Sequence, residues 1–241
     1  MNKTGRKIWF YVILTIVAAV WLLPLVMLVL SAIRSTSDFY AKLNLFSIPE
    51  KIQWSNFKDA WTDGNLGRYL FNGIRTCLIK VPLGVLISSM CAFALTRLNI
   101  PHSNGIFIFI LVGMMLPVQM ALIPLNIMYS KLNLSNTYFS LIFTYIGFGI
   151  SLGTLVFRGF FRSILKELDE AAAMDGCGKY RLYANIIMPV AKPAVATMFI
   201  LDFLSTWNEF LLQSVLITKD TMKTVPNGLI SFMGEFSTDY G

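Results

Sequence analysis

The fold is decided by Ile8–Ile33, which reads IWFYVILTIVAAVWLLPLVMLVLSAI and contains no charged residue. A helix needs about 20 consecutive, mostly apolar residues to cross the bilayer core. Lys3, Arg6 and Lys7 precede this stretch, as basic residues precede the apolar region of a secretory signal. The apolar stretch is too long for such a signal, and no small-residue cleavage pattern follows it. We therefore predict a retained membrane span here.

The composition of the whole chain agrees with a membrane protein. Of the 241 residues, 56% are hydrophobic and 14% are charged, with a net charge of +7. A soluble domain usually has about 25% charged residues. This composition excludes an ordinary soluble enzyme, a disordered chain and a disulfide scaffold. We predict an all-α integral membrane protein, a polytopic helical bundle. Its expected spans lie at about 8–33, 70–96, 105–128, 134–157 and 189–217.

Several residues inside these spans suggest local features. Lys80 lies in the first half of the second span, and we expect it to snorkel to the interface. Pro117 and Pro124 lie in the third span, which we expect to be kinked. Gly149 and Gly153 form a small-xxx-small pair that suits close helix packing. Loop charges leave the topology open, because Lys and Arg divide nine against eight between the two sides.

The loop of residues 158–188 is predicted to contain a short amphipathic helix that ends at the Asp175–Gly176 turn. The apolar residues that fall on one face are Ile164, Leu165, Leu168, Ala171 and Ala172. Small residues allow another surface to approach closely, which favours docking into a groove on a partner. A solvated linker helix is the alternative.

The same loop resembles a known family motif. Glu170-Ala171-Ala172, then Gly176, then Ile186 and Pro189 are similar to the EAA loop in permease subunits of bacterial ATP-binding-cassette importers. The family motif ends Ile-x-Leu-Pro, and Met188 replaces its leucine here. The resemblance implies that this loop docks in a cleft of a cytoplasmic ATPase subunit. The implied contact residues are Glu170, Ala171, Ala172, Asp175 and Gly176.

Three further segments resemble the sugar permease branch, and the smaller permease of maltose-type systems most of all. They are Met115–Leu125, Leu134–Tyr138 and Trp207–Phe210. The likeness extends from the first span to about Phe210. It implies a single permease domain over residues 1–241 that normally has six spans. The sixth is missing after the mixed segment 218–241, so we expect a truncated chain.

The resemblance also implies the setting of the protein. A second and different permease would complete the translocation path, and two ATPase subunits would bind from the cytoplasm. An external solute-binding protein would deliver a sugar or oligosaccharide, and nucleic acid has no part. The multi-pass chain would lie in the bacterial inner membrane with a cytoplasmic N-terminus and a cytoplasmic 158–188 loop.

The sequence lacks a phosphate-binding loop. Gly178-Lys179 resembles the end of one, but Ala173 and Tyr180 break the required G-x-x-x-x-G-K-[ST] pattern. We therefore expect a partner chain to hydrolyse ATP, and no cofactor, metal or catalytic residue on this chain. The lone His102 is expected to be a solvated loop residue.

Polar residues in the fifth span fall within a sector about 100° wide on one helical face. They are Asp202, Ser205, Thr206, Glu209 and Gln213. Such a stripe lines a sugar route or, alternatively, forms hydrogen bonds between helices. We include Asn208, and Gln119 from the third span, among the candidate path residues. For Gln119 the alternative is that it lies at a kink that serves helix packing.

Other functions are left open by the residues alone. A permease of the same class for a non-sugar solute is one, and a membrane enzyme or anchor is another. Asp202 and Glu209 would lie about 10 Å apart along a helix, too far for a dyad that shares a proton. The outer segment 34–69 suits either contact with a binding protein or a cap over the spans.

Overall fold

The computed structural model describes residues 3–35, 37–38, 47–49 and 51–232. The chain divides into two compact units, residues 1–67 with 229–241 and residues 68–228. The first unit contains α1 (Lys3–Ala32) and α3 (Ser55–Thr62). The apolar side chains of α1 are exposed, as in a helix that lipid solvates. The Asn56 amide donates to the backbone oxygens of Ala32 (3.1 Å) and Arg34 (2.9 Å), which satisfies the carbonyl of the last α1 residue.

The second unit contains two further helices that are long and apolar enough to cross a membrane. These are α4 (Leu66–Arg97) and α7 (Tyr138–Ser163). With α1 they lie at the predicted spans 8–33, 70–96 and 134–157, although α7 begins at Tyr138 rather than 134 and ends at Ser163 rather than 157. Thr137 begins α7 by accepting the Ser140 N–H at 3.3 Å.

The predicted span 105–128 consists of two helices. These are α5 (Ser103–Met115) and α6 (Val118–Lys131), which meet at an angle of 93°. Leu116 takes an extended conformation because the ring of Pro117 disfavours a helical residue before it. Pro124 lies inside α6 without ending it. The expected kink is therefore a sharp break at Pro117.

The predicted span 189–217 is also corrected. Helix α11 (Lys192–Trp207) meets the preceding segment at 79°. That segment runs through α9 (Lys179–Arg181), the π-helix η1 (Leu182–Ile187) and α10 (Met188–Val190). After α11, Asn208 is non-helical, and α12 (Leu211–Leu216) follows as a separate helix. If each bent pair counts as one span, the described residues provide up to five spans.

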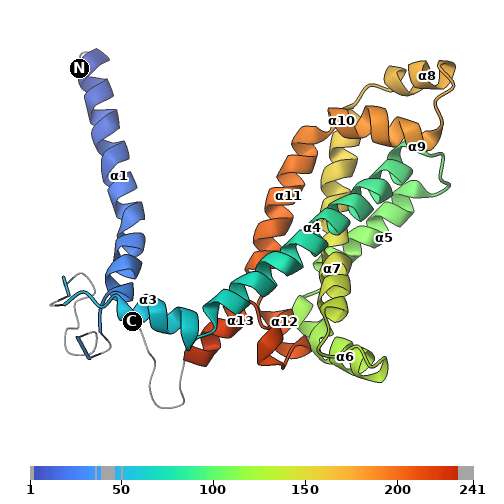
Figure 1. Cartoon of the computed structure of the whole chain (residues 1–241). Coiled ribbons are helices and arrows are strands. Elements are labelled where there is room, and N and C mark those ends of the chain that lie inside the picture. Colours follow the sequence, from blue (N-terminus) through green and yellow to red (C-terminus); the bar gives the residue numbers. More distant parts are fainter. Residues whose placement is uncertain (1–2, 36, 39–46, 50, 233–241) are drawn as a thin grey trace. The chain divides into compact units, whose positions relative to one another are not determined.

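The remaining elements are short. Helix α8 (Glu167–Met174) lies in the 158–188 loop. After Ile217 come η2 (Asp220–Met222), α13 (Val225–Gly228) and η3 (Leu229–Phe232). Residues 233–241, the end of the mixed segment noted in the sequence, lie outside the described residues. Within the second unit, α8, α9 and α10 lie at one end of α4, α5, α7 and α11, whereas α6 and α12 lie at the other end (Figure 1).

The main core of this unit lies where α4, α7, η1 and α11 meet. Phe157, Phe161 and Ile187 are fully buried there. A Cβ atom at Gly153 would lie 2.5 Å from Ser88 Oγ, so α7 and α4 cross closely at a glycine. The prediction that Gly153 serves close helix packing is confirmed.

Candidate coupling helix and polar cavity

Helix α8 contains most of the residues expected to contact an ATPase. Its first turn is acidic, with Glu167, Asp169 and Glu170, which the positive end of the helix dipole favours. The helix stops at Asp175, and Gly176 follows with a φ of 72°. Glycine adopts this left-handed conformation without steric cost. The predicted Asp175–Gly176 helix stop is therefore confirmed.

The helix begins later than the sequence pattern indicated. Ile164 is the buried C-terminal cap of α7 and does not belong to α8. Leu165 and Leu168 belong to the same predicted apolar face but are 68% and 41% exposed. The predicted apolar face is therefore wrong. Its first residue belongs to the buried end of α7 and its second to the exposed start of the loop, and only their spacing in the sequence matches that of a helix.

The five predicted coupling residues differ in exposure. Ala172 is 5% exposed and lies on the side of α8 that faces the rest of the unit. The other four are exposed and are small or acidic, namely Glu170, Ala171, Asp175 and Gly176. Met174, between these two pairs in the sequence, is 84% exposed. This face is therefore available to a partner.

Arg97, the last residue of α4, joins α8 to the spans. Its guanidinium forms an ion pair with Asp169 of α8, with Nη1 2.7 Å from Oδ2. The Nη2 atom donates to the backbone oxygens of Phe161 (2.9 Å) and Ile164 (2.8 Å) at the end of α7. One buried side chain, 4% exposed, therefore holds α4, α7 and α8 together. Sequence analysis missed this role because neither partner is near Arg97 in the chain.

A cavity of about 200 Å³ lies inside the second unit among α4, α6, α7, α11 and α12. Predicted path residues Asp202, Thr206 and Glu209 line it, as does Ser205 of the polar stripe. Lys80, Tyr145 and Gly149 approach the same space from α4 and α7. The cavity therefore gathers much of the predicted stripe with residues from other helices.

A buried ion pair forms one wall of the cavity. The Lys80 ammonium donates to Asp202 Oδ1, and the two side chains are 3% and 11% exposed. A Cβ atom at Gly149 would lie 3.2 Å from Lys80 Nζ, so glycine makes room for the pair. The expected snorkelling of Lys80 is corrected, because a charge inside a membrane protein is stabilised best by an opposite charge. The available signal was an intramembrane Lys and an intramembrane Asp in otherwise charge-poor helices.

Glu209 has a structural role as well as a place in the cavity wall. Its carboxylate accepts the N–H groups of Leu212 (2.8 Å) and Gln213 (3.1 Å), which caps the start of α12. The Tyr145 hydroxyl donates to Glu209 Oε2 at 2.7 Å. The glutamate therefore starts a new helix where α11 has ended and links it to α7.

The remaining predicted path residues lie outside the cavity lining. Gln213 is fully buried, and its Oε1 accepts from Thr224 and from Asn227 (2.8 Å). Asn208 is exposed, and its amide donates to Leu204 O at 2.9 Å. Gln119 is exposed on α6. For Gln213, this geometry favours the alternative of hydrogen bonds within the fold.

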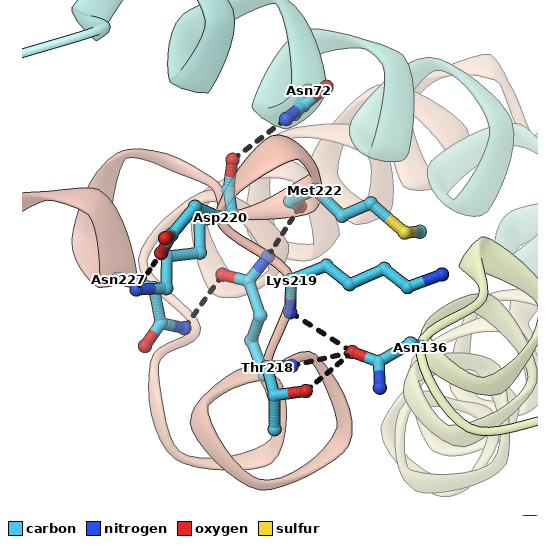
Figure 2. A network of polar contacts seen from close by, with 9 residues as sticks. Asn72, Asn136, Thr218, Lys219, Asp220, Met222 and Asn227 are labelled. Atoms are coloured by element: carbon cyan, nitrogen blue, oxygen red, sulfur yellow. Dashed lines mark hydrogen bonds and ion pairs between the residues drawn. The ribbon is translucent and has the colours of Figure 1, made fainter.

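A polar network fixes the segment after Ile217, and Figure 2 shows its two asparagine anchors. Asn136 Oδ1 accepts the backbone N–H groups of Thr218 (2.7 Å) and Lys219 (3.1 Å). The Asn72 amide donates to the backbone oxygens of Thr221 and Lys223, each at 2.9 Å. Asn136 has a φ of 58°, a left-handed conformation that asparagine tolerates. Asn136 belongs to the Leu134–Tyr138 motif, so that motif has a structural purpose here.

Comparison with known proteins decides the class of this chain. Residues 84–238 match the family described as "Binding-protein-dependent transport system inner membrane component". The chain belongs to this family. It is therefore an inner-membrane permease subunit of an ATP-binding-cassette importer. In such importers separate ATPase subunits hydrolyse ATP, and a second permease and a solute-binding protein complete the system.

Individual relatives are similar over most of their length. The "Diacetylchitobiose uptake system permease protein NgcG" of Streptomyces coelicolor is 30% identical over 96% of this chain and 76% of the relative. The "Multiple sugar-binding transport system permease protein MsmG" of Streptococcus mutans is 32% identical over 97% of this chain and 84% of the relative. A bacterial transporter for import of the acidic polysaccharide alginate has a chain with a TM-score of 0.83 and 24% identity. That match covers 99% of this chain and 84% of the other. It shows the same fold.

Proposed function

We propose that the chain forms half of the translocation path of an ATP-driven carbohydrate importer. The names of two similar permeases, one for diacetylchitobiose uptake and one for multiple sugars, support a carbohydrate as the substrate. The observation that carries the proposal is the exposed acidic and small-residue face of α8, held on the spans by Arg97.

Coupling begins at α8. Glu170, Ala171, Ala172, Asp175 and Gly176 form the contact region for a cytoplasmic ATPase, with Ala172 supporting it from the buried side. ATP is used on that partner, and this chain needs no cofactor of its own. When the ATPase subunits close, α8 moves, and Arg97 carries the movement to the ends of α4 and α7. Alternating access then follows from the tilt of these helices.

The rest of the assembly follows from the same proposal. The N-terminus and the 158–188 loop lie in the cytoplasm. A second, different permease closes the path, two ATPases bind from the cytoplasm, and an external binding protein delivers the saccharide. Asp202, Thr206 and Glu209 form the polar wall of the path, because hydroxyl groups of sugars need hydrogen-bond partners. Path roles for Asn208, Gln119 and Gln213 stay predictions.

Substitution at Ala171 tests the coupling contact. Ala171 is exposed on a helix, so Ala171→Trp leaves this chain folded but obstructs a docked partner. The full importer is reconstituted in liposomes and tested for ATP-dependent uptake of labelled maltotriose, diacetylchitobiose, raffinose and trigalacturonate. We expect Ala171→Trp to reduce uptake more than tenfold, whereas Ala171→Ser, which keeps a small side chain, transports normally. Normal uptake by Ala171→Trp would contradict the proposed coupling role of α8.

A further inference from the structure

The segment 34–69, for which the sequence left open a contact with a binding protein or a cap over the spans, contains a helix with an aromatic side. Trp54, Phe57 and Trp61 are spaced by three and four residues, so at 100° per residue they fall within a sector about 60° wide. Trp54 precedes the first residue of α3 but shares its helical backbone conformation, with φ −69° and ψ −18°. The three side chains are 53% to 69% exposed, and the ring centroids of Trp54 and Phe57 lie 5.9 Å apart. Helix α3 therefore presents three large rings to its surroundings on one side.

The opposite side of α3 is acidic. Asp59 and Asp63 lie about 150° or more from the centre of the aromatic sector, and both are exposed. A division between bulky apolar residues and charged residues is typical of a helix that lies in the plane of a membrane surface. Residues 54–63 contain one lysine and two aspartates, a net charge of −1, so they do not attract anionic lipids. The aromatic side chains must then supply the binding to such a surface.

Hydrogen bonds hold the start of α3 at the end of α1. The Gln53 N–H donates to Ile33 O at 2.9 Å, and the Asn56 amide donates to two further backbone oxygens of the same stretch. The membrane-spanning part of α1, Lys7–Ala32, has 26 residues. A helix of that length measures about 39 Å, whereas the apolar core of a bilayer is about 30 Å thick. The end of α1, and with it the start of α3, therefore lies in the headgroup region.

The other end of α3 is also close to a span. Only residues 63–65 separate α3 from α4, which is long and apolar enough to cross a membrane. A Cβ atom at Gly67, the second residue of α4, would lie 3.0 Å from Trp61 Cζ2, so the Trp61 ring packs against the start of that helix. Both ends of α3 are thus held near the membrane surface, where tryptophan is enriched in membrane proteins.

Lipid is the occupant that fits this aromatic side. A solute-binding protein would cover it only while docked, and three large rings would face water during the rest of the transport cycle. Lipid is always present, and the aromatic side of α3 continues from the end of α1, whose apolar side chains are exposed as lipid-facing ones are. Burial of the rings in lipid removes their apolar surface from water permanently.

We propose that α3 is an interfacial anchor that binds uncharged phospholipid at the membrane surface where α1 ends. Trp54, Phe57 and Trp61 insert between the headgroups and the upper acyl chains, whereas Asp59 and Asp63 face water. The anchor holds the link between α1 and α4 at the membrane surface, and it needs no anionic lipid.

Spin labels on the two sides of α3 test this anchor. Phe57→Cys and Asp59→Cys each carry a nitroxide in a background with Cys91 and Cys177 replaced by serine, and Cys77 stays because it is buried. The full importer, with any cysteines of its partner subunits also replaced, is reconstituted in phosphatidylcholine liposomes. Electron paramagnetic resonance measures how often each label collides with oxygen, which concentrates in lipid, and with a polar nickel chelate, which stays in water.

We expect the ratio of oxygen to nickel collisions at position 57 to exceed that at position 59 about threefold or more, because an interfacial helix buries its apolar side about 5 to 10 Å into the bilayer. Addition of phosphatidylglycerol should leave the ratio unchanged, and so should addition of the solute-binding protein. Few collisions of either kind at position 57 would show that protein covers the aromatic side, and frequent nickel collisions would show that water does. Either result would overturn the anchor, as would immobilisation of the label at position 57 by the binding protein. A ratio at position 57 that rises only with phosphatidylglycerol would overturn binding to uncharged lipid.

A second set of variants tests the rings themselves. In the Phe57→Cys background, Trp54→Ser should raise the nickel collision rate of the label about twofold or more, because the anchor loses a second aromatic side chain. Trp54→Tyr, which keeps an aromatic residue that favours the interface, should leave the rate near its original value. Asp59→Ser changes the water-facing side and is the matched control, for which we expect no change. Equal nickel rates for Trp54→Ser and for the unchanged Trp54 would contradict the anchoring role of this ring.

Discussion

Single residues decide where the helices of this permease begin. The first N–H groups of a helix have no carbonyl partner in a preceding turn, and the Glu209 carboxylate accepts two of them at the start of α12. It also accepts the hydroxyl of Tyr145. The residue was predicted to belong to a polar stripe, and its position in the Trp207–Phe210 motif now has a physical reason. A carboxylate at a helix N-terminus benefits from the helix dipole as well as from its hydrogen bonds.

We expect Glu209→Ala to destabilise the protein by about 1 to 2 kcal/mol, as loss of a helix cap does. Thermal unfolding of the purified importer measures this change. Tyr145→Phe removes one of the three bonds and leaves both backbone contacts, so its effect should be smaller. If the two variants unfold at the same temperature as the unchanged protein, Glu209 does not act as a cap.

At the scale of helices, close crossing depends on individual glycines. Gly153 of α7 lies against Ser88 of α4, whereas a Cβ atom at Gly159 of the same helix would meet nothing within 4 Å. The same substitution should therefore have opposite effects at the two positions.

We expect Gly153→Ala to lower stability by about 1 to 3 kcal/mol, because the added methyl group overlaps Ser88. Gly159→Ala should be neutral or stabilising by up to about 1 kcal/mol, because alanine favours a helix more than glycine does. Thermal unfolding of both variants tests this. Adding Ser88→Gly to Gly153→Ala should partly restore stability. If it does not, overlap with Ser88 is not the cause of the loss.

The contact between α8 and the spans is a second prediction at this scale. Arg97→Met removes the ion pair to Asp169 and both bonds to α7, so we expect uptake to fall at least tenfold. Hydrolysis of ATP by the partner should continue, since the docking face of α8 is unchanged. Asp169→Asn keeps the two bonds from Arg97 to α7 and should have a milder effect. Parallel assays of uptake and hydrolysis distinguish uncoupling from loss of assembly.

The sequence predicted helices well where apolar stretches are continuous, as in α1, α4 and α7. It failed where a side chain at a distance sets the outcome. The break after α11 depends on Glu209 as a cap, and the position of Lys80 depends on Asp202, which is 122 residues away. The candidate coupling residues came from a motif, whereas Arg97 carries no local signal of its role. The periodicity of apolar residues reports only local conformational preference, so it does not predict contacts between residues far apart in the sequence.

For the whole molecule, topology follows from the two ends of the second unit. Helix α8 and the segment around Thr218 lie at opposite ends of the helices between them (Figure 1). If the 158–188 loop is cytoplasmic, native Cys177 must react with an impermeant thiol reagent only from the cytoplasmic side.

We expect Thr218→Cys, in a Cys177→Ser background, to react only from the outer side. Labelling of intact cells and of inverted vesicles measures both sites. Thr218 is exposed, so access does not limit the reaction. Reaction of Cys177 in intact cells would show that the chain has the opposite orientation.

The separation of Lys80 from Asp202 along the chain also matters during synthesis. A ribosome that adds roughly 5 to 20 residues per second needs about 6 to 24 s to extend from one to the other. During that interval the α4 segment carries a lone ammonium, which costs about 3 kcal/mol at the centre of a bilayer. Insertion of α4 is therefore less favourable until α11 emerges and Asp202 provides the opposite charge.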